Sequence, residues 1–474
     1  MRNNIVFKTI RTFQSQYLYD RHTNAIIRLT ESEYNEISQV EDGILCSEQS
    51  PLFTKLQSKG LLLPNKVERI EHSATSIIER YLYTKIEQLI LQVTQQCNLR
   101  CEYCAYSGIY RNNRTHANER MSLYNAKRAI DMYIERSVEL PEVNISFYGG
   151  EPLLEFRMIK QCVDYANNLV EGRKIRFHMT TNGTLLTDDV IKYLVKNDFV
   201  LSISLDGSKE EHDINRKFAN GKGSFDLIIQ NIMRIKELYP EYSKQIMILT
   251  TVNPYHDLDC VLEYFSTEEI LNDKFILFNN MNEMDLDTTI TYDEKYYQTR
   301  NYEYIKMLFS LTGKLDTKYV SNLVLSSKQL LEKLQKKQKT HTSISPVCHH
   351  NGPCLPGVRR LFVRTDGSLF PCERTGDKLD YFIIGTLDNG FDIAHIKKLL
   401  NIGKLTEDEC INCWGLRQCT MCVKQIEFEI EPSRSIKLKE CNKSCIKVYN
   451  DLFELCILNE HGFNLSDDIV RLLT

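Results

Sequence analysis

Three cysteines with short spacing are the residues of this sequence that most clearly indicate chemistry. Cys97, Cys101 and Cys104 lie within eight residues, directly after an apolar run at 89–93. Three thiolates can hold three corners of a cubane [4Fe–4S] cluster, which leaves the fourth iron free to bind another molecule. A structural zinc site is the alternative, but it requires four ligands, and neither His116 nor a nearby cysteine has convincing spacing to complete it.

A second group of cysteines lies in the C-terminal part of the chain. Its eight members are Cys348, Cys354, Cys372, Cys410, Cys413, Cys419, Cys422 and Cys441. They suffice for two four-ligand clusters, and Cys445 is an alternative to Cys441 as the last ligand. Two zinc sites are the competing interpretation, because C-x2-C pairs also suit zinc.

The bulk composition predicts where such a protein works. The chain has 474 residues, sixteen cysteines and a net charge of -4. It shows no apolar segment like that of a secretion signal and no uninterrupted apolar stretch of roughly 20 residues that could span a membrane. We therefore expect a cytoplasmic protein of two or three domains, without nucleic-acid or membrane partners, whose cysteines serve as metal ligands or reactive thiols.

The cysteine triplet must be positioned by the elements around it, and these alternate between strands and helices. Apolar strands are predicted at 89–93, 143–148, 175–179, 199–205, 246–252 and 275–278, separated by segments of helical length. Helical periodicity places apolar residues on one face of 126–134 and of 225–235. Six such units predict an α/β fold with a parallel sheet, closed or partly closed as a barrel, and chemistry at the carboxyl ends of the strands. A doubly wound open sheet is the alternative.

The N-terminal segment, residues 1–75, is predicted to be a small module. A hairpin at 17–29 precedes Thr30, which forms a capping box with Glu33, and a second helix begins at Ser50-Pro51. The apolar run at 61–63 is taken as a terminal strand. Together with the hairpin and the two helices, it suggests a winged-helix-like domain. An extension that packs on the main domain is the alternative.

The remaining segments are divided by composition. Residues 85–285 are predicted to be the barrel, 286–345 a polar helical linker, 346–450 a cysteine-rich module and 451–474 a C-terminal helix or tail. The cysteine-rich module has few long periodic segments, so we expect metal to hold it together.

The triplet resembles the signature of the radical S-adenosylmethionine (SAM) superfamily, CxxxCxΦC, with Tyr103 as the aromatic residue before the last cysteine. Gly149-Gly150-Glu151-Pro152, after the second strand, is similar to the motif that binds the amino group of SAM in that family. The resemblance implies that the three cysteines are catalytic and hold a [4Fe–4S] cluster, and that SAM is cleaved to a 5′-deoxyadenosyl radical. It further implies that SAM lies near Asn182, Ser204 and Arg216.

The C-terminal cysteines resemble the SPASM domain of radical SAM peptide maturases, which carries two auxiliary clusters. By this likeness Cys348, Cys354, Cys372 and Cys422 hold the first cluster, and Cys410, Cys413, Cys419 and Cys441 the second. If Cys348 is not a ligand, one iron of the first cluster is open. The spacing departs from many family members, because two residues rather than three separate Cys419 from Cys422.

Segments around the C-terminal cysteines are similar to maturases of Cys-rich ribosomal peptides that form sactipeptides or ranthipeptides. Among them are 352–357, 360–363, 371–374 and 413–419. The resemblance implies thioether formation on a precursor peptide whose leader binds the N-terminal module, with flavodoxin or ferredoxin as electron donor. The alternatives are formylglycine formation, as in anaerobic sulfatase maturases, and a non-catalytic Fe–S electron carrier.

Overall fold

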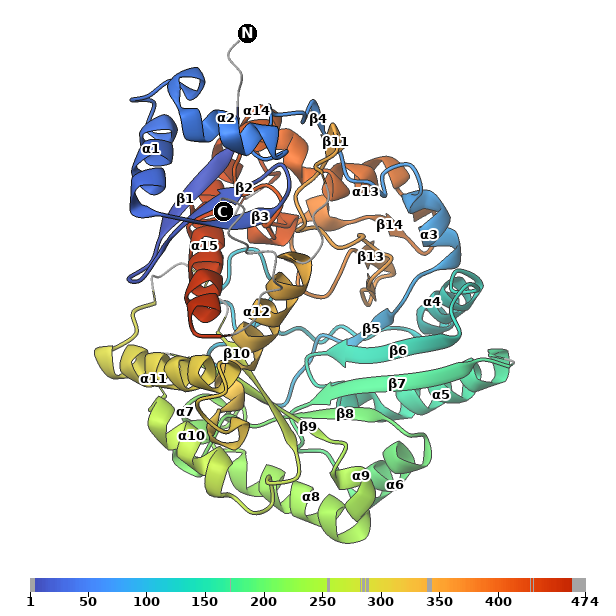
Figure 1. Cartoon of the computed structure of the whole chain (residues 1–474). Coiled ribbons are helices and arrows are strands. Elements are labelled where there is room, and N and C mark those ends of the chain that lie inside the picture. Colours follow the sequence, from blue (N-terminus) through green and yellow to red (C-terminus); the bar gives the residue numbers. More distant parts are fainter. Residues whose placement is uncertain are drawn as a thin grey trace.

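A mixed α/β architecture with one central sheet organises the chain (Figure 1). The computed structural model describes residues 5–462 except 171, 254–255, 282, 284–285, 287–289, 339–342, 427 and 429, and it leaves out the side chains at 326, 335, 337 and 338. In the described part of the chain, no helix combines the length and apolar character needed to cross a lipid bilayer.

Six parallel strands follow one another in chain order and confirm the predicted partial barrel. They are β5 (Leu89–Thr94), β6 (Glu142–Gly149), β7 (Lys174–Thr181), β8 (Val200–Ser204), β9 (Met247–Val252) and β10 (Phe275–Asn280). The main connecting helices are α4 (Leu123–Glu135), α5 (Phe156–Leu169), α6 (Asp188–Lys196), α7 (Lys209–Asn215), α8 (Phe225–Leu238) and α10 (Leu258–Thr267). Their apolar faces pack on the strands, as at Ala126, Ile130 and Ile232. All strand carboxyl ends therefore meet at one edge.

The cysteine-rich segment continues this sheet beyond β5. Strand β12 (Leu361–Val363) pairs in parallel with β5, with Leu361 opposite Leu89. Strands β13 (Ser368–Phe370), β14 (Gly385–Thr386) and β15 (Gly390–Phe391) then add in antiparallel order. Each has only two or three residues, too few for a periodic pattern to predict. Cys372 follows β13 closely, so this pairing holds the cysteine beside the barrel.

Three antiparallel strands form the N-terminal sheet: β1 (Phe7–Arg11), β2 (Gln16–Asp20) and β3 (Ala25–Leu29). The predicted hairpin is confirmed, as are the Thr30–Glu33 capping box at α1 (Glu31–Glu41) and the Ser50 cap of α2 (Pro51–Ser58). The strand predicted at 61–63 is wrong, because Leu62 has a φ of 48°, a left-handed conformation that ends an extended run.

Both faces of the N-terminal sheet are buried, and they are buried by opposite ends of the chain. Helices α1 and α2 cover one face through Ile37, Phe53 and Leu56. The other face packs on α15 (Arg434–Glu460), where Leu452 and Leu455 contact it (Figure 1). Residues 451–460 of the predicted C-terminal segment belong to this helix, and 463–474 lie outside the described residues.

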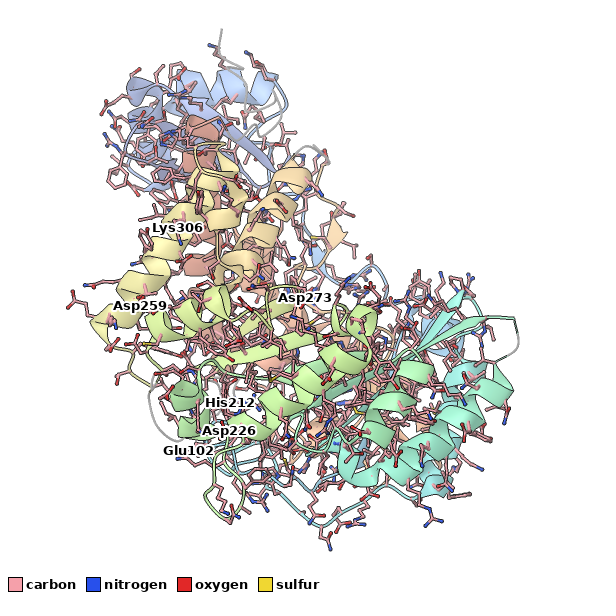
Figure 2. The ribbon with its side chains drawn as sticks, turned by 90° about the horizontal axis from the view of Figure 1, so that it is seen from below. Glu102, His212, Asp226, Asp259, Asp273 and Lys306 are labelled. Atoms are coloured by element: carbon pink, nitrogen blue, oxygen red, sulfur yellow. The ribbon has the colours of Figure 1, made fainter. Side chains whose placement is uncertain are left out.

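Two helices occupy much of the predicted linker. Helix α11 (Glu294–Leu311) lies against α10, where Thr299 Oγ1 donates to Asp259 Oδ1 at 2.7 Å; Asp259 is labelled in Figure 2. Helix α12 (Leu325–Gln338) packs on α15 through Leu334. The helical character predicted for this segment is therefore confirmed within the described residues.

Removal of a buried side chain from α15 tests whether the two chain ends share a core. Leu452 is fully buried, so Leu452→Ala should lower the free energy of unfolding by about 2 to 5 kcal/mol. Trp414, the single tryptophan, lies 6.5 Å from Tyr19 of β2 and reports unfolding by its fluorescence. Lys447→Ala breaks an exposed ion pair with Asp451 and should cost less than about 1 kcal/mol. Equal losses in both variants would contradict a shared core.

Candidate functional site

The predicted site residues gather at the carboxyl edge of the barrel strands. The Cys97 to Cys104 segment, which we name the triplet site, follows β5. Gly149 ends β6, Asn182 follows β7 and Ser204 ends β8. Residues separated by more than 100 positions therefore share one site because parallel strands bring their ends together.

A close approach of two backbone segments explains the paired glycines. The amide nitrogen of Gly150 donates to Thr94 O at 3.0 Å, and that of Glu151 donates to Gln96 O at 2.9 Å. A Cβ atom on Gly149 would lie 2.1 Å from Thr94 O, and one on Gly150 would lie 2.1 Å from Gln96 O. Only glycine therefore allows the β6 end to support the triplet site.

The three cysteines of the triplet site are half-buried, and their thiols lie within electrostatic reach of one another. Burial raises the pKa of Cys97 to about 11 and the pKa of Cys101 to about 12, so both hold their protons unless a metal replaces them. The amide nitrogen of Leu99 donates to Cys97 Sγ and that of Tyr106 to Cys104 Sγ, both at 3.4 Å. Such donors stabilise bound thiolates, so the residues present fit the predicted cluster.

Glu151 is held in one orientation although it is almost completely buried. Its carboxylate accepts hydrogen bonds from Thr181 Oγ1 at 2.7 Å, Asn182 N at 2.8 Å and Leu153 N at 3.1 Å. Burial raises the pKa of this carboxyl, and the three donors act against that rise. The carboxylate thus fixes the start of the segment after β7.

Asn182 connects that segment to the triplet site. Its Nδ2 atom donates to Asn98 Oδ1 at 2.8 Å and lies 3.9 Å from Cys97 Sγ. Its Oδ1 atom accepts from Thr184 Oγ1 at 2.6 Å, and Asn98 Nδ2 donates back to Thr184 Oγ1 at 2.8 Å. The predicted residue Asn182 therefore contacts the triplet site in the structure.

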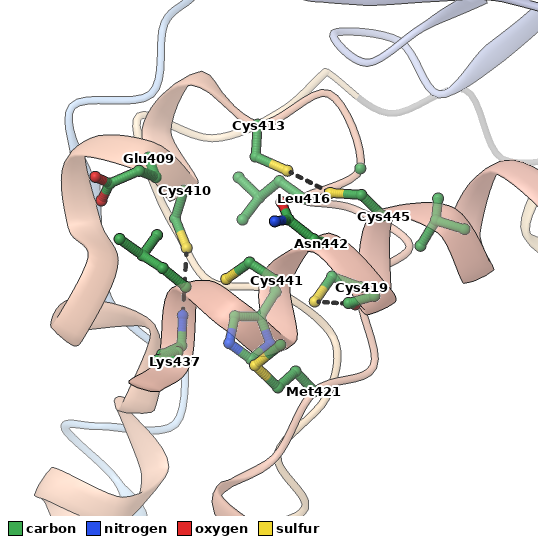
Figure 3. Close-up of a pocket in the computed structure, with 15 residues that line it drawn as sticks. Glu409, Cys410, Cys413, Leu416, Cys419, Met421, Lys437, Cys441, Asn442 and Cys445 are labelled. Carbon is green, nitrogen blue, oxygen red and sulfur yellow. Dashed lines mark hydrogen bonds between the residues drawn. The ribbon is translucent and has the colours of Figure 1, made fainter. Parts of the chain in front are cut away.

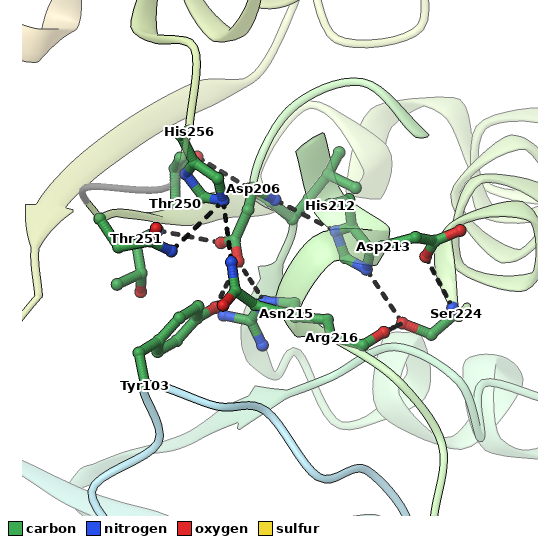
Figure 4. Close-up of polar contacts among 12 residues, drawn as sticks. Tyr103, Asp206, His212, Asp213, Asn215, Arg216, Ser224, Thr250, Thr251 and His256 are labelled. Carbon is green, nitrogen blue, oxygen red and sulfur yellow. Dashed lines mark hydrogen bonds and ion pairs between the residues drawn. The ribbon is translucent and has the colours of Figure 1, made fainter. Parts of the chain in front are cut away.

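A buried ion pair lies next to the triplet site (Figure 4). Arg216 Nε donates to Asp206 Oδ2 at 2.8 Å, and Tyr103 OH donates to the same oxygen. Thr251 N donates to Asp206 Oδ1 at 3.0 Å. Burial acts to raise the pKa of Asp206, but Arg216 outweighs it and holds that pKa below its usual range. The structure thus brings Tyr103 and Arg216 together through Asp206, a residue that was not among the predicted site residues.

A cavity of about 250 Å³ lies between the barrel strands and the cysteine-rich segment. Its lining includes Gln88, Ser146, Tyr148, His178, Ser202, Met247, Arg360 and Glu373. Glu373 pairs with Arg360 through Oε1, while its buried Oε2 has no hydrogen-bond partner among the described residues. Burial raises the pKa of Tyr148, which also lines the cavity, to about 12, and the nearby Glu373 and Cys104 add to that rise. Sequence reasoning missed Glu373, although its position directly after Cys372 was a signal.

The C-terminal cysteines form two separate groups. Burial raises the pKa of Cys372 to about 12, and Glu373, Cys354 and Cys422 add to that rise. Cys354 and Cys422 therefore lie near Cys372, and we name these three cysteines the trio. Cys348 packs instead beside Cys410 and lies near Arg21 and Arg417. The structure therefore does not bring Cys348 to the trio.

The second group lines a cavity of about 330 Å³, which we name the five-cysteine cavity (Figure 3). Its thiols come from Cys410, Cys413, Cys419, Cys441 and Cys445. Cys413 Sγ lies 3.9 Å from Cys445 Sγ, and this shared hydrogen bond raises the pKa of Cys413 and lowers the pKa of Cys445. Both Cys441 and Cys445 thus face the cavity. Among the described residues, no histidine, cysteine or acidic side chains are grouped for a single metal ion.

The N-terminal sheet is attached to the loop that carries these cysteines. Arg21, fully buried at the end of β2, donates from Nη1 to Ile411 O at 2.6 Å and to Cys413 O at 3.2 Å. Arg417 Nη1 returns a hydrogen bond to His22 O at 3.0 Å. Arg21 could not be found from the sequence, because no motif surrounds it.

Comparison with known proteins identifies the barrel. Residues 91–265 match the sequence profile of the Radical SAM superfamily. The match spans the triplet site and the strands β6 to β9. The chain therefore contains a radical SAM domain, as the triplet and the paired glycines predicted.

Relatives extend the likeness beyond that domain. The cysteine-type anaerobic sulfatase-maturating enzyme of Clostridium novyi (strain NT) is 27% identical over 338 residues, which are 69% of this chain and 85% of that protein. The radical SAM cyclopropyl synthase TigE of Paramaledivibacter caminithermalis is 29% identical over 223 residues, 44% of this chain and 45% of that protein.

Solved structures share the fold. Native anSMEcpe with bound AdoMet matches with a TM-score of 0.56 at 22% identity, and native anSMEcpe with bound AdoMet and Kp18Cys peptide matches with 0.54 at 23%. Each match covers 79% of this chain and 99% of the other. These likenesses support the α/β barrel with its cysteine-rich extension.

The buried pair next to the triplet site should be important for stability. Asp206→Asn leaves Arg216 as an uncompensated buried cation, so we expect a loss of about 3 to 5 kcal/mol in thermal unfolding at neutral pH. The folded-state pKa of Asp206 is lowered, so its contribution is present above about pH 4 and is lost as the pH falls through the folded pKa. Asp188→Asn removes the exposed partner of Arg234 and should cost less than about 1 kcal/mol. A similar small loss for Asp206→Asn would contradict the assignment.

Proposed function

Since the chain contains a radical SAM domain, we propose that it forms thioether bonds in a ribosomally made, cysteine-containing precursor peptide. The bond joins a cysteine sulfur to a carbon of an acceptor residue, and the peptide loses two hydrogens for each bond. When bound, SAM and the [4Fe–4S] cluster on Cys97, Cys101 and Cys104 supply a 5′-deoxyadenosyl radical that can remove hydrogen from carbon. The observation that carries the proposal is the N-terminal sheet attached through Arg21 to a cysteine-rich loop.

Residues of the carboxyl edge have assigned roles in this proposal. Gly149, Gly150 and Glu151 are assigned to the amino group of SAM, and the absence of side chains on both glycines lets this segment lie against Thr94 and Gln96 beside the triplet site. Asn182, Ser204 and Arg216 are assigned to the carboxylate and ribose of SAM, with Tyr103 orienting Arg216 through Asp206.

Glu373 is assigned as the acceptor of the thiol proton from the peptide cysteine. One carboxylate oxygen is engaged by Arg360, and the other is buried without a partner among the described residues that surround it. A carboxylate held in this way presents one oxygen toward a substrate in the barrel cavity. The proton moves to Glu373 as the sulfur becomes the thiolate that bonds to the carbon radical, and the remaining electron would leave through the auxiliary clusters assigned to the C-terminal cysteines.

Two auxiliary [4Fe–4S] clusters are assigned to the C-terminal cysteines. Cys354, Cys372 and Cys422 would hold the first with one iron left open, because Cys348 packs beside Cys410 instead. Cys410, Cys413 and Cys419 would hold the second, together with Cys441 or Cys445. In this assignment residues 346–450 are an auxiliary-cluster domain beside the radical SAM barrel of residues 85–285.

The N-terminal sheet is assigned to precursor recognition. Strands β1 and β3 are its two outer strands, and a leader peptide could add to one of them through backbone hydrogen bonds. Residues 1–75 would then be the recognition domain, with residues 286–345 as linker and 451–474 as C-terminal segment. A peptide partner fits the likeness to anSMEcpe, which was solved with Kp18Cys peptide bound. A flavodoxin or ferredoxin would supply electrons.

Formylglycine formation is the second candidate, and the relatives favour it. The matches cover 85% of the Clostridium novyi protein and 99% of anSMEcpe. About a fifth of this chain lies outside the anSMEcpe match, and a separate recognition sheet has no obvious use in converting a single cysteine. A pure electron carrier is disfavoured, because it has no use for the residues at 149–151 that are assigned to the amino group of SAM.

Peptide mass separates these candidates. We expect that anaerobic co-expression with a Cys-containing precursor encoded beside the gene yields a peptide that has lost two hydrogens per cysteine, retains sulfur and resists alkylation after reduction. Fragmentation then locates the acceptor. Cys104→Ser is the control and should leave the peptide unmodified. Loss of sulfur from a single residue would instead establish formylglycine formation.

Glu373 can be tested without disturbing the cluster sites. Glu373→Gln keeps a partner for Arg360 but accepts no proton, so product formation should fall about 100-fold or more, the usual range for a general base. Iron content and SAM binding should stay at wild-type levels. Glu87→Gln is the matched control, because Glu87 forms an exposed pair with Arg359 at 2.7 Å. Full activity of Glu373→Gln would reject its role.

A further inference from the structure

A buried lysine faces the five-cysteine cavity and has no place in the proposed reaction. Lys437 on α15 is 1% exposed, and it is the one lysine or arginine among the described residues that line this cavity (Figure 3). Its Nζ atom donates to Thr406 Oγ1 at 2.5 Å and lies 3.7 Å from Cys410 Sγ. Thr406 Oγ1 in turn lies 3.4 Å from the same sulfur. The ammonium is therefore aimed at a cysteine rather than at solvent.

No carboxylate balances the charge of Lys437 in the described part of the chain. Glu409, on the wall of the same cavity, pairs with Arg434 instead. A buried ammonium without a counter-ion is strongly disfavoured, because burial removes its hydration. The position therefore points to an anion inside the cavity.

The spacing along α15 presents the charge and two thiols together. Lys437, Cys441 and Cys445 recur every four residues, so they lie on one face of the helix. All three line the cavity. A cluster held by four thiolates on a [4Fe–4S]²⁺ core carries a net charge of about −2, and one-electron reduction makes it more negative.

We propose that Lys437 is the counter-ion of the cluster in the five-cysteine cavity and raises its reduction potential. The inference rests on the auxiliary cluster assigned in the proposed function. A fixed positive charge stabilises the reduced, more negative state more than the oxidised state. Thr406 is a positioning residue, because its hydroxyl holds the ammonium beside Cys410.

The test is a redox titration followed by electron paramagnetic resonance. It uses the full chain, assembled anaerobically with iron and sulfide, with Cys97, Cys101 and Cys104 replaced by alanine so that only auxiliary clusters contribute. In Lys437→Met the ratio of reduced to oxidised cluster at a fixed potential should fall at least tenfold for one of the two couples. That change is a shift of about 59 mV toward negative potential for a one-electron couple.

Lys439→Met is the matched control, because Lys439 is exposed on the same helix and should leave both potentials unchanged. An unchanged midpoint in Lys437→Met at full iron content overturns the inference. If Lys437→Met loses iron from this cavity, the titration is repeated with Lys437→Arg, which keeps the positive charge. Iron retained at the wild-type midpoint supports the counter-ion role, and equal loss in both variants overturns it.

Failure of the proposed function would look different. If the chain that carries only the three triplet replacements gives no cluster signal from this cavity, the auxiliary assignment and this inference are overturned together. A chain that carries the cluster, shows the shift in Lys437→Met and still makes no thioether would retain the inference and reject the proposed product.

Discussion

The parallel pairing of β12 with β5 is the contact on which the site depends. Strand β5 leads into the cysteine triplet, and β12 leads through β13 to Cys372 and Glu373. Because the two strands share backbone hydrogen bonds, the triplet site and the trio are attached to one sheet rather than to two domains joined by a flexible segment. The barrel cavity, which Tyr148 and Glu373 both line, lies next to this pairing.

Two buried ion pairs lie beside the triplet segment. Asp206 and Arg216 neutralise each other beside the triplet, and Arg114 pairs with Asp377 at 3.1 Å where the triplet segment meets the cysteine-rich segment. Each pair is costly to bury and therefore costly to break. Lys437 differs from these pairs, because its ammonium contacts the hydroxyl of Thr406 and the thiol of Cys410 and pairs with no carboxylate among the described residues, and this difference marks the five-cysteine cavity as a place for an anion.

The two chain ends assemble around one small sheet. Tyr17 of β2 and Thr12, which directly follows β1, both donate to Glu460 at the end of α15, at 2.9 Å and 2.5 Å. The same helix carries Cys441 and Cys445 into the cavity, and Arg21 holds the opposite side of the cysteine loop. The sheet, the helix and the loop are thus joined by hydrogen bonds and packing. These contacts connect the surface assigned to peptide recognition with the cysteines assigned to the second auxiliary cluster.

Local patterns in the sequence determined much of this protein. The six barrel strands, the helix at 225–238 and the Thr30 capping box follow from apolar periodicity and short-range hydrogen bonding, which act between neighbours along the chain. The cysteine triplet and the paired glycines pointed to the radical SAM domain for the same reason, because the chemistry resides in residues that are close in sequence. The tertiary structure alone decided the partners of Arg21, Asp206, Glu373 and Lys437. Their contacts join segments far apart in the chain, and single charged residues look like solvated surface until packing buries them.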